Sequence, residues 1–230
     1  MASSKCFGSG FAGLGWLCFA TGAGNDNQNE GVMNDNPEGR FDRDKWNKKY
    51  RRKAIADFPP SALFRAFSER IPFADIPKGD VLELACGLSG TALAFARRGR
   101  KVLAVDVSDV GMARLADEAR KQGLDDLIEP VTDDLVTWIP SRRDFALVIC
   151  SLYWDKRVFG YAHELVKPQG YLAWEGFSPL CKKYRPDSKY VMGEDEPLSL
   201  LPAAFTVIEH RDVDNGGSTV SRRLIARNAP

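Results

Sequence analysis

From residue 79 onward, short apolar runs alternate with longer stretches in which apolar residues recur every three to four positions. Residues 101–106 (KVLAVD) are typical of a buried strand, and residues 110–122 (VGMARLADEARKQ) form an amphipathic helical pattern closed by Gly123. The same patterns predict strands at 80–85, 101–106, 127–132, 145–150 and 171–177, and helices at 91–98, 110–122 and around 161–166. Strands separated by helices of this length predict a parallel sheet with both faces covered.

The end of the chain breaks this alternation. Residues 205–212 and 218–226 are both strand-like, and the turn sequence DNGG at 214–217 separates them. Two strands joined by such a turn predict a β-hairpin, which would close the sheet with an antiparallel pair. The expected fold class is therefore α/β, a mostly parallel sheet that ends in an antiparallel hairpin.

The first 40 residues differ from the rest of the 230, because they hold 8 of the 20 glycines and 5 of the 8 asparagines. We predict a Gly/Asn-rich, disordered or targeting-like extension at 1–40 and one folded domain at 41–230. The apolar stretch 7–20 is shorter than the roughly 20 apolar residues that span a bilayer. Organelle targeting or export by residues 1–24 stays open.

Charge and cysteine usage narrow the class of protein. The chain carries 32 Lys and Arg against 31 Asp and Glu, and this balance argues against a dedicated nucleic-acid binder. Its five cysteines include no CxxC pair and no histidine at metal-ligand spacing, so we expect neither a metal site nor a disulfide framework. These features favour a cytoplasmic protein that acts on a small molecule, and they do not indicate an oligomeric state.

The densest chemical signal is the segment 81–90, VLELACGLSG, together with Asp106 at the end of the next expected strand. A glycine directly after a buried strand allows a sharp turn and a close approach by a ligand. An acid at the tip of the second strand is placed to accept hydrogen bonds from ribose hydroxyls. No G-x-G-x-x-G is present, which weakens a dinucleotide interpretation. Glu83 in the first strand needs a partner, either a cationic ligand or a Lys or Arg of the chain.

These residues carry a resemblance. The segment ELACG with Glu83, the strand VLAVDVS with Asp106, the segment DLVTWIP from Asp134 and the terminal hairpin resemble class I S-adenosylmethionine-dependent methyltransferases. Trp46 and Tyr50, four residues apart ahead of the core, narrow the resemblance to the tellurite-resistance and thiopurine type that methylates small molecules. The resemblance covers roughly residues 40–228. It implies a Rossmann-like sheet of seven strands with helices on both faces, and S-adenosyl-L-methionine as the cofactor.

The resemblance also implies a cofactor site. In that site Glu83 would lie near the amino group, Asp106 would bind the ribose hydroxyls, and Asp134 would recognise the adenine edge. The full set of implied cofactor residues is Trp46, Tyr50, Glu83, Ala85, Cys86, Gly87, Ser89, Asp106, Val107, Asp134, Leu135, Cys150 and Ser151. Ser89 and Ala85 stand where many relatives have glycine. Several of these residues have structural alternatives: Asp134 as a helix cap, Cys150 as core packing, and the Trp46 and Tyr50 pair as helix packing.

The acceptor side is less defined by the sequence. Tyr153 and Trp154 follow the fourth expected strand, and Tyr184 lies in the long loop 178–201 that could cover the site. The basic run at 48–53 reads as a solvated helix face or as a contact for RNA or an anionic substrate. No residue is predicted to be catalytic, which suits a thiol, metalloid or similar soft nucleophile. Alternatives are a catalytically silent cofactor-binding module and a nucleotide-dependent oxidoreductase.

Overall fold

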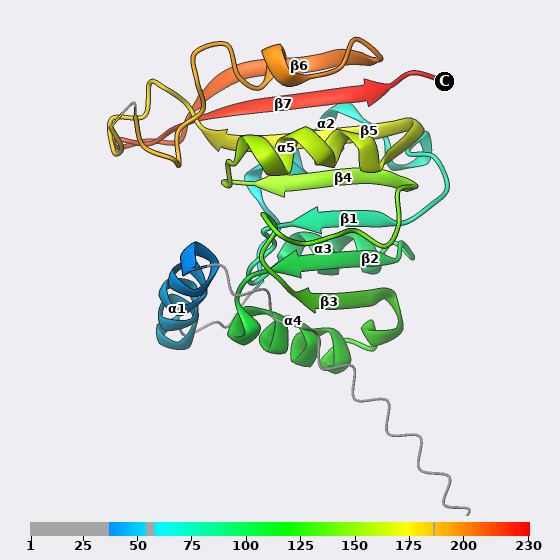
Figure 1. Cartoon of the computed structure of the whole chain (residues 1–230). Helices are drawn as coiled ribbons and strands as arrows, with labels where there is room; N and C mark the ends of the chain where they lie inside the picture. The colour runs from blue at the N-terminus through cyan, green and yellow to red at the C-terminus, as the bar shows by residue number, and fades with distance from the viewer. Residues whose placement is uncertain (1–36, 54–57, 186) are drawn as a thin grey trace, which may run out of the picture. The chain divides into compact units, whose positions relative to one another are not determined.

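The computed structural model describes residues 37–53, 58–185 and 187–230 (Figure 1). The predicted extension at 1–40 therefore lies almost entirely outside the described residues. Helix α1 (Pro37–Arg52) begins just before the predicted domain start at residue 41. This helix carries Trp46 and Tyr50.

One mixed sheet of seven strands organises the domain, in the order β3-β2-β1-β4-β5-β7-β6. Its strands are β1 (Val81–Leu84), β2 (Val102–Asp106), β3 (Ile128–Thr132), β4 (Phe145–Ser151), β5 (Val166–Phe177), β6 (Phe205–Asp214) and β7 (Val220–Asn228). The first five pair in parallel, whereas β7 pairs antiparallel with both β5 and β6. The predicted fold class, including the terminal hairpin, is confirmed.

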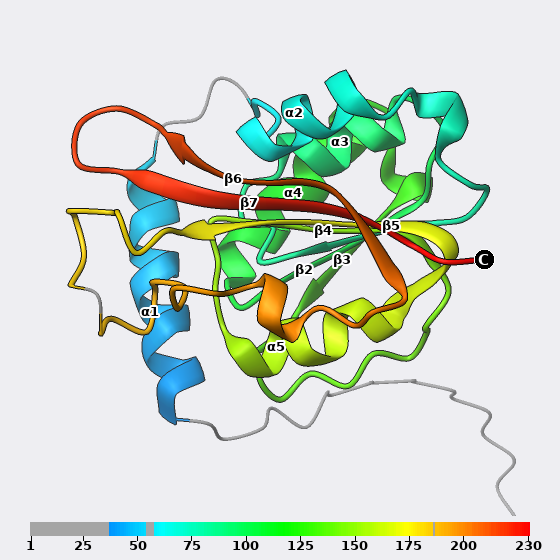
Figure 2. The ribbon, with the colours of Figure 1, turned by 90° about the horizontal axis from the view of Figure 1, so that it is seen from above.

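Helices cover both faces of the sheet (Figure 2). Helices α2 (Ala62–Arg70), α3 (Gly90–Ala96) and α4 (Asp109–Lys121) pack on one face, and α5 (Lys156–Ala162) packs on the other. Every residue of β1 and β2 is buried, as expected for strands covered on both faces. Burial on two sides fixes these strands in the middle of the domain and holds their carboxyl ends together at one edge.

Three elements depart from the predictions. Helix α2 was not predicted, although Ser61 caps it by accepting a hydrogen bond from the Phe64 amide. Strand β5 begins at Val166, well before the expected residue 171. Its sequence KPQG at 167–170 looks like a turn, and Gln169 does adopt a positive φ of 64°. The helix expected around 161–166 ends earlier, because α5 stops at Ala162 and a short 3₁₀ turn follows.

Two features are absent from the described residues. There, no helix is long and apolar enough to cross a membrane. That part of the chain also holds no group of three or more His, Cys, Asp or Glu side chains arranged to bind a metal ion.

Candidate functional site

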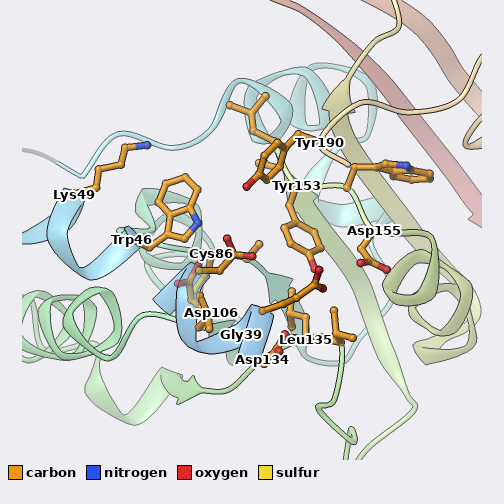
Figure 3. Close-up of a pocket in the computed structure, with 18 of the residues that line it drawn as sticks. Gly39, Trp46, Lys49, Cys86, Asp106, Asp134, Leu135, Tyr153, Asp155 and Tyr190 are labelled. Atoms are coloured by element: carbon orange, nitrogen blue, oxygen red, sulfur yellow. Dashed lines mark hydrogen bonds between the residues drawn. The ribbon is translucent and has the colours of Figure 1, made fainter. Parts of the chain in front are cut away.

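A cavity of about 450 Å³ opens at the carboxyl ends of β1, β2 and β4. Helix α1 forms one wall, and the strand ends with their following loops form the floor and the opposite wall (Figure 3). Pockets that hold small molecules have volumes of roughly 300–1,000 Å³, so a ligand of nucleoside size fits. The carboxyl edge of a parallel sheet is also where α/β folds bind their ligands.

The loop between β1 and α3 is shaped for close approach. Ala85 and Gly87 both have left-handed backbone conformations, with φ of 50° and 56°. A Cβ atom at position 87 would lie 2.4 Å from the Tyr50 hydroxyl oxygen, so only glycine fits there. The Gly87 amide is turned toward β2 and donates a 2.9 Å hydrogen bond to Asp106 Oδ2. The loop and the tip of β2 are therefore held as one unit.

Asp106 is the buried acid of the cavity. Its second oxygen, Oδ1, accepts a 2.9 Å hydrogen bond from the Ser108 amide, and the side chain lines the cavity. Burial raises the pKa of this carboxyl to about 6, although the two backbone hydrogen bonds act in the opposite direction. A carboxylate oxygen can accept more than one hydrogen bond, so each oxygen keeps acceptor capacity for a ligand hydroxyl.

Glu83 and Ser89 lie behind the loop and do not line the cavity. Ser89 Oγ is 2.5 Å from Glu83 Oε2, and the same hydroxyl accepts from the Ala92 amide as the N-cap of α3. Burial raises the pKa of the Glu83 carboxyl to about 8. Ser89 thus has a structural task that glycine could not perform. Among the described residues, the partner of Glu83 is a hydroxyl group and not a Lys or Arg.

Helix α1 is fastened over the cavity by Asn47. Its side chain accepts a 2.6 Å hydrogen bond from the Ser108 hydroxyl and donates one of 2.6 Å to Asp109 Oδ1 at the start of α4. This places Trp46 and Tyr50 along the cavity wall, with ring centroids 5.6 Å apart (Figure 3). Burial and the nearby Asp106 raise the pKa of Tyr50 well above its ordinary value, so its hydroxyl stays protonated.

The opposite wall comes from the end of β4. Leu152 has a positive φ of 57°, and backbone strain of this kind often marks functional sites. The cavity side of this segment carries Ser151, Tyr153 and Trp154. The Ser151 hydroxyl is buried and has no hydrogen-bond partner within the described residues, so it is available to a ligand. Burial raises the pKa of Tyr153 well above its ordinary value and removes it as a general base.

The structure brings together most of the predicted site residues. Eleven of them line the cavity: Trp46, Tyr50, Ala85, Cys86, Asp106, Val107, Asp134, Leu135, Ser151, Tyr153 and Trp154. Glu83, Gly87 and Ser89 support the loop from behind. Cys150 is fully buried in the core on the α5 side of the sheet, in line with its structural alternative. The Tyr184 ring packs at a tilt against Phe177, with centroids 4.8 Å apart, and does not line the cavity.

Several cavity residues were not predicted. Tyr190 takes the place expected for Tyr184, and Gly39 approaches Asp134 so closely that a Cβ there would lie 2.3 Å from its carboxylate. Three lysines, at 49, 53 and 189, also line the cavity. The first two belong to the basic run 48–53, for which contact with an anionic substrate was one of the interpretations open from the sequence. Helical spacing offered one usable signal, because Lys49 and Lys53 lie three residues from Trp46 and Tyr50 respectively.

A sheet of this order with an acid-tipped second strand and a glycine loop under the cavity defines a class I methyltransferase fold. Residues 81–170 match the family described as "Methyltransferase domain". The predicted resemblance is thereby confirmed for residues 81–170, the part of the chain that matches a methyltransferase domain. No curated protein matches the sequence.

Solved structures with the same fold include methyltransferases and one protein of different chemistry. Magnesium protoporphyrin IX methyltransferase (ChlM) from Synechocystis PCC 6803 with bound SAH is 15% identical, over 84% of this chain and 100% of that one, with a TM-score of 0.66. TehB from Haemophilus influenzae is 15% identical over 81% and 66%, with a TM-score of 0.60. The [4+2]-cyclase SpnF is 17% identical over 73% and 80%, at 0.59. At these identities the similarity establishes the fold and selects no subfamily or substrate.

Proposed function

We propose that this chain binds S-adenosyl-L-methionine in the α1-covered cavity and transfers its methyl group to a small-molecule acceptor. The observation that carries the proposal is Asp106, a buried carboxylate at the tip of β2 that lines the cavity and is held by hydrogen bonds from the Gly87 and Ser108 amides, one to each oxygen. Two adjacent acceptor oxygens suit the vicinal hydroxyls of a ribose. Val107 beside it would contact the adenine ring, and Asp134 with the Leu135 amide would recognise the adenine edge.

The residues present fit this cofactor. The cavity volume suits a ligand of that size, and the left-handed turn at Ala85 and Gly87 lets the backbone pass under an extended chain. Glu83 is buried without a cationic partner of the protein among the described residues, and the ammonium group of the cofactor would provide one. We therefore keep the role that the resemblance implies for Glu83 as a proposal, reached through a rearrangement of its hydrogen bond to Ser89.

S-adenosyl-L-methionine supplies a methyl carbon already activated by a sulfonium, so the protein contributes mainly alignment and exclusion of water. Trp46 and Tyr50 would cover the cofactor, and Tyr153 with Trp154 would form the wall against which the acceptor lies. Neither histidine lines the cavity, and Tyr50 and Tyr153 stay protonated because burial raises the pKa of both. This arrangement supports an acceptor that needs little help from a base, such as a thiol or a metalloid oxyanion.

Two measurements test the proposal. Calorimetry with S-adenosylhomocysteine and with NAD separates a methyltransferase from a nucleotide-dependent oxidoreductase, and we expect binding of the former alone. A radiolabelled methyl donor, offered with thiols, metalloid oxyanions and purines, then identifies the acceptor. SpnF has this fold and is named a cyclase, so the fold alone does not establish methyl transfer. If this chain binds S-adenosylhomocysteine but transfers the labelled methyl group to no acceptor, it is instead a catalytically silent binding module.

A further inference from the structure

Four cationic side chains line the cavity, and they fall into two kinds. Arg157 is paired with Asp155 at 2.7 Å, and Lys189 with Asp42 at 3.7 Å. Lys49 and Lys53 line the same cavity, and no carboxylate of the described residues lies within 4.0 Å of either ammonium group. The mouth of the cavity next to α1 therefore carries positive charge that the described part of the chain does not neutralise.

Two more lysines converge on this mouth. Lys45 lies one helical turn before Lys49 and donates a 2.9 Å hydrogen bond to the Tyr190 hydroxyl. Lys183 comes from the loop after β5, the loop whose Tyr190 accepts the hydrogen bond from Lys45 on α1. The pKa of Lys49 is lowered by burial first, and then by repulsion from Lys53, Lys183 and Lys45. We call these four residues (45, 49, 53 and 183) the lysine mouth.

Aromatic rings accompany the lysine mouth. The Lys49 ammonium lies 4.1 Å from the Trp46 ring centroid, and that of Lys45 lies 4.6 Å from the Tyr190 ring centroid. Figure 3 shows Lys49 directly beside Trp46, with Tyr190 across the cavity. Such contacts hold the ammonium groups in place while leaving their donors free for an anion.

A solvated helix face explains only part of this arrangement. Cations in the last turn of α1 interact favourably with the helix dipole whichever way they point. Like charges four residues apart are, however, unfavourable on a helix. Lys45, Lys49 and Lys53 repeat at that spacing, and the lysine from a separate loop adds to the repulsion. An anionic ligand at the mouth would turn this repulsion into attraction.

We infer that the acceptor carries an oxyanion, a carboxylate or a phosphate, which Lys49 and Lys53 bind at the mouth of the cavity. Lys183 adds to the attraction, and Trp46 and Tyr190 contact the apolar body of the acceptor. The inference rests on the proposed function, because it names the substrate class of the same site. It predicts a ternary complex in which the anion and the cofactor occupy different ends of one cavity.

The test uses the full chain saturated with S-adenosylhomocysteine. Benzoate and phenyl phosphate are titrated calorimetrically as carboxylate and phosphate probes, and benzamide serves as the uncharged counterpart of benzoate. The variant is Lys49→Gln with Lys53→Gln, and the matched control is Lys48→Gln. Lys48 is an exposed lysine on the same helix that does not line the cavity. A short single-stranded RNA is titrated in parallel.

We expect at least one of the two anionic probes to bind wild type and the control at least tenfold more tightly than the double variant, with benzamide not binding measurably. Raising the salt concentration should weaken that binding. Equal anion binding by variant and control, or none to wild type, would overturn the inference. A large loss of S-adenosylhomocysteine affinity in the variant would assign the lysines to the cofactor carboxylate instead. If the RNA binds wild type, and Lys48→Gln weakens that binding as much as the double variant does, the lysines belong to a nucleic-acid contact. If wild type fails to bind S-adenosylhomocysteine at all, the proposed function itself fails.

Discussion

The buried carboxyl of Glu83 should make the free energy of unfolding depend on pH. Its side chain is 4% exposed, and burial raises the pKa of its carboxyl from 4.5 to about 8. Between these two pH values the folded protein holds a proton that the unfolded chain has released. The free energy of unfolding therefore falls as pH rises, by about 1.4 kcal/mol for each pH unit well inside this window. The loss from this one group amounts to about 3 kcal/mol between pH 4.5 and pH 7.

The substitution Glu83→Gln removes this titration and keeps a similar shape. Urea unfolding of the cofactor-free protein, followed by tryptophan fluorescence, should show the variant gaining about 3 kcal/mol on wild type between pH 4.5 and pH 7. Glu129→Gln, at an exposed position of β3, is the control and should show no pH-dependent difference. The slope from Asp106 is common to all three proteins and cancels. A difference between Glu83→Gln and wild type that stays constant with pH would refute the reasoning.

Three further predictions concern Asn47, Arg223 and the extension that precedes the described residues. Asn47→Ala removes the three hydrogen bonds of its side chain to the start of α4. It should lower the free energy of unfolding by about 1–3 kcal/mol and weaken S-adenosylhomocysteine binding in calorimetry. Arg223→Met leaves Glu175 as a buried charge without its 2.9 Å partner and should cost about 3–5 kcal/mol in urea unfolding; a loss below about 1 kcal/mol would contradict this. Deleting residues 1–36 should leave the affinity for S-adenosylhomocysteine within about twofold of that of the full chain. A tenfold loss would show that the extension has a role in the site.

Strands β2 and β4 were predictable because each consists almost entirely of apolar residues. Residues 101–106 and 145–150 were expected as strands, and β2 and β4 lie within one residue of those limits. The start of β5 was missed because Pro168 reads as a turn signal, and a local signal does not show that the backbone continues into the sheet beyond it. Such tertiary pairing overrides local preference.

The residues of the cavity floor could be predicted from the sequence, whereas fewer of those at the cavity mouth could. Asp106 is the last residue of β2 and Gly87 lies three residues after the end of β1, so their position at the carboxyl edge follows from topology alone. Tyr190 comes from a long loop without periodicity, and nothing in its sequence distinguished it from Tyr184. The lysine mouth depends on the packing of α1 beside that loop, which no local pattern encodes.

The affinity of the cavity for the cofactor should depend on pH through Asp106. Burial raises the pKa of Asp106 to about 6, so this carboxyl is ionised at neutral pH and becomes protonated as pH falls below that value. A protonated acid accepts hydrogen bonds less strongly than a carboxylate does. Cofactor affinity should therefore weaken as pH falls from 7 toward 5, and calorimetry at several pH values checks the sign. An affinity that is level over this range would show that Asp106 does not contact the ligand.

The central claim is that Asp106 holds the ribose of a bound S-adenosyl nucleoside. Its most direct test is calorimetric titration of S-adenosylhomocysteine into wild type and Asp106→Ala, with circular dichroism confirming that the variant is folded. Two charge-assisted hydrogen bonds of about 1.5–3 kcal/mol each are lost, so we predict binding to wild type and at least hundredfold weaker binding to the variant. Equal affinity of the two folded proteins would contradict the account and place the cofactor elsewhere.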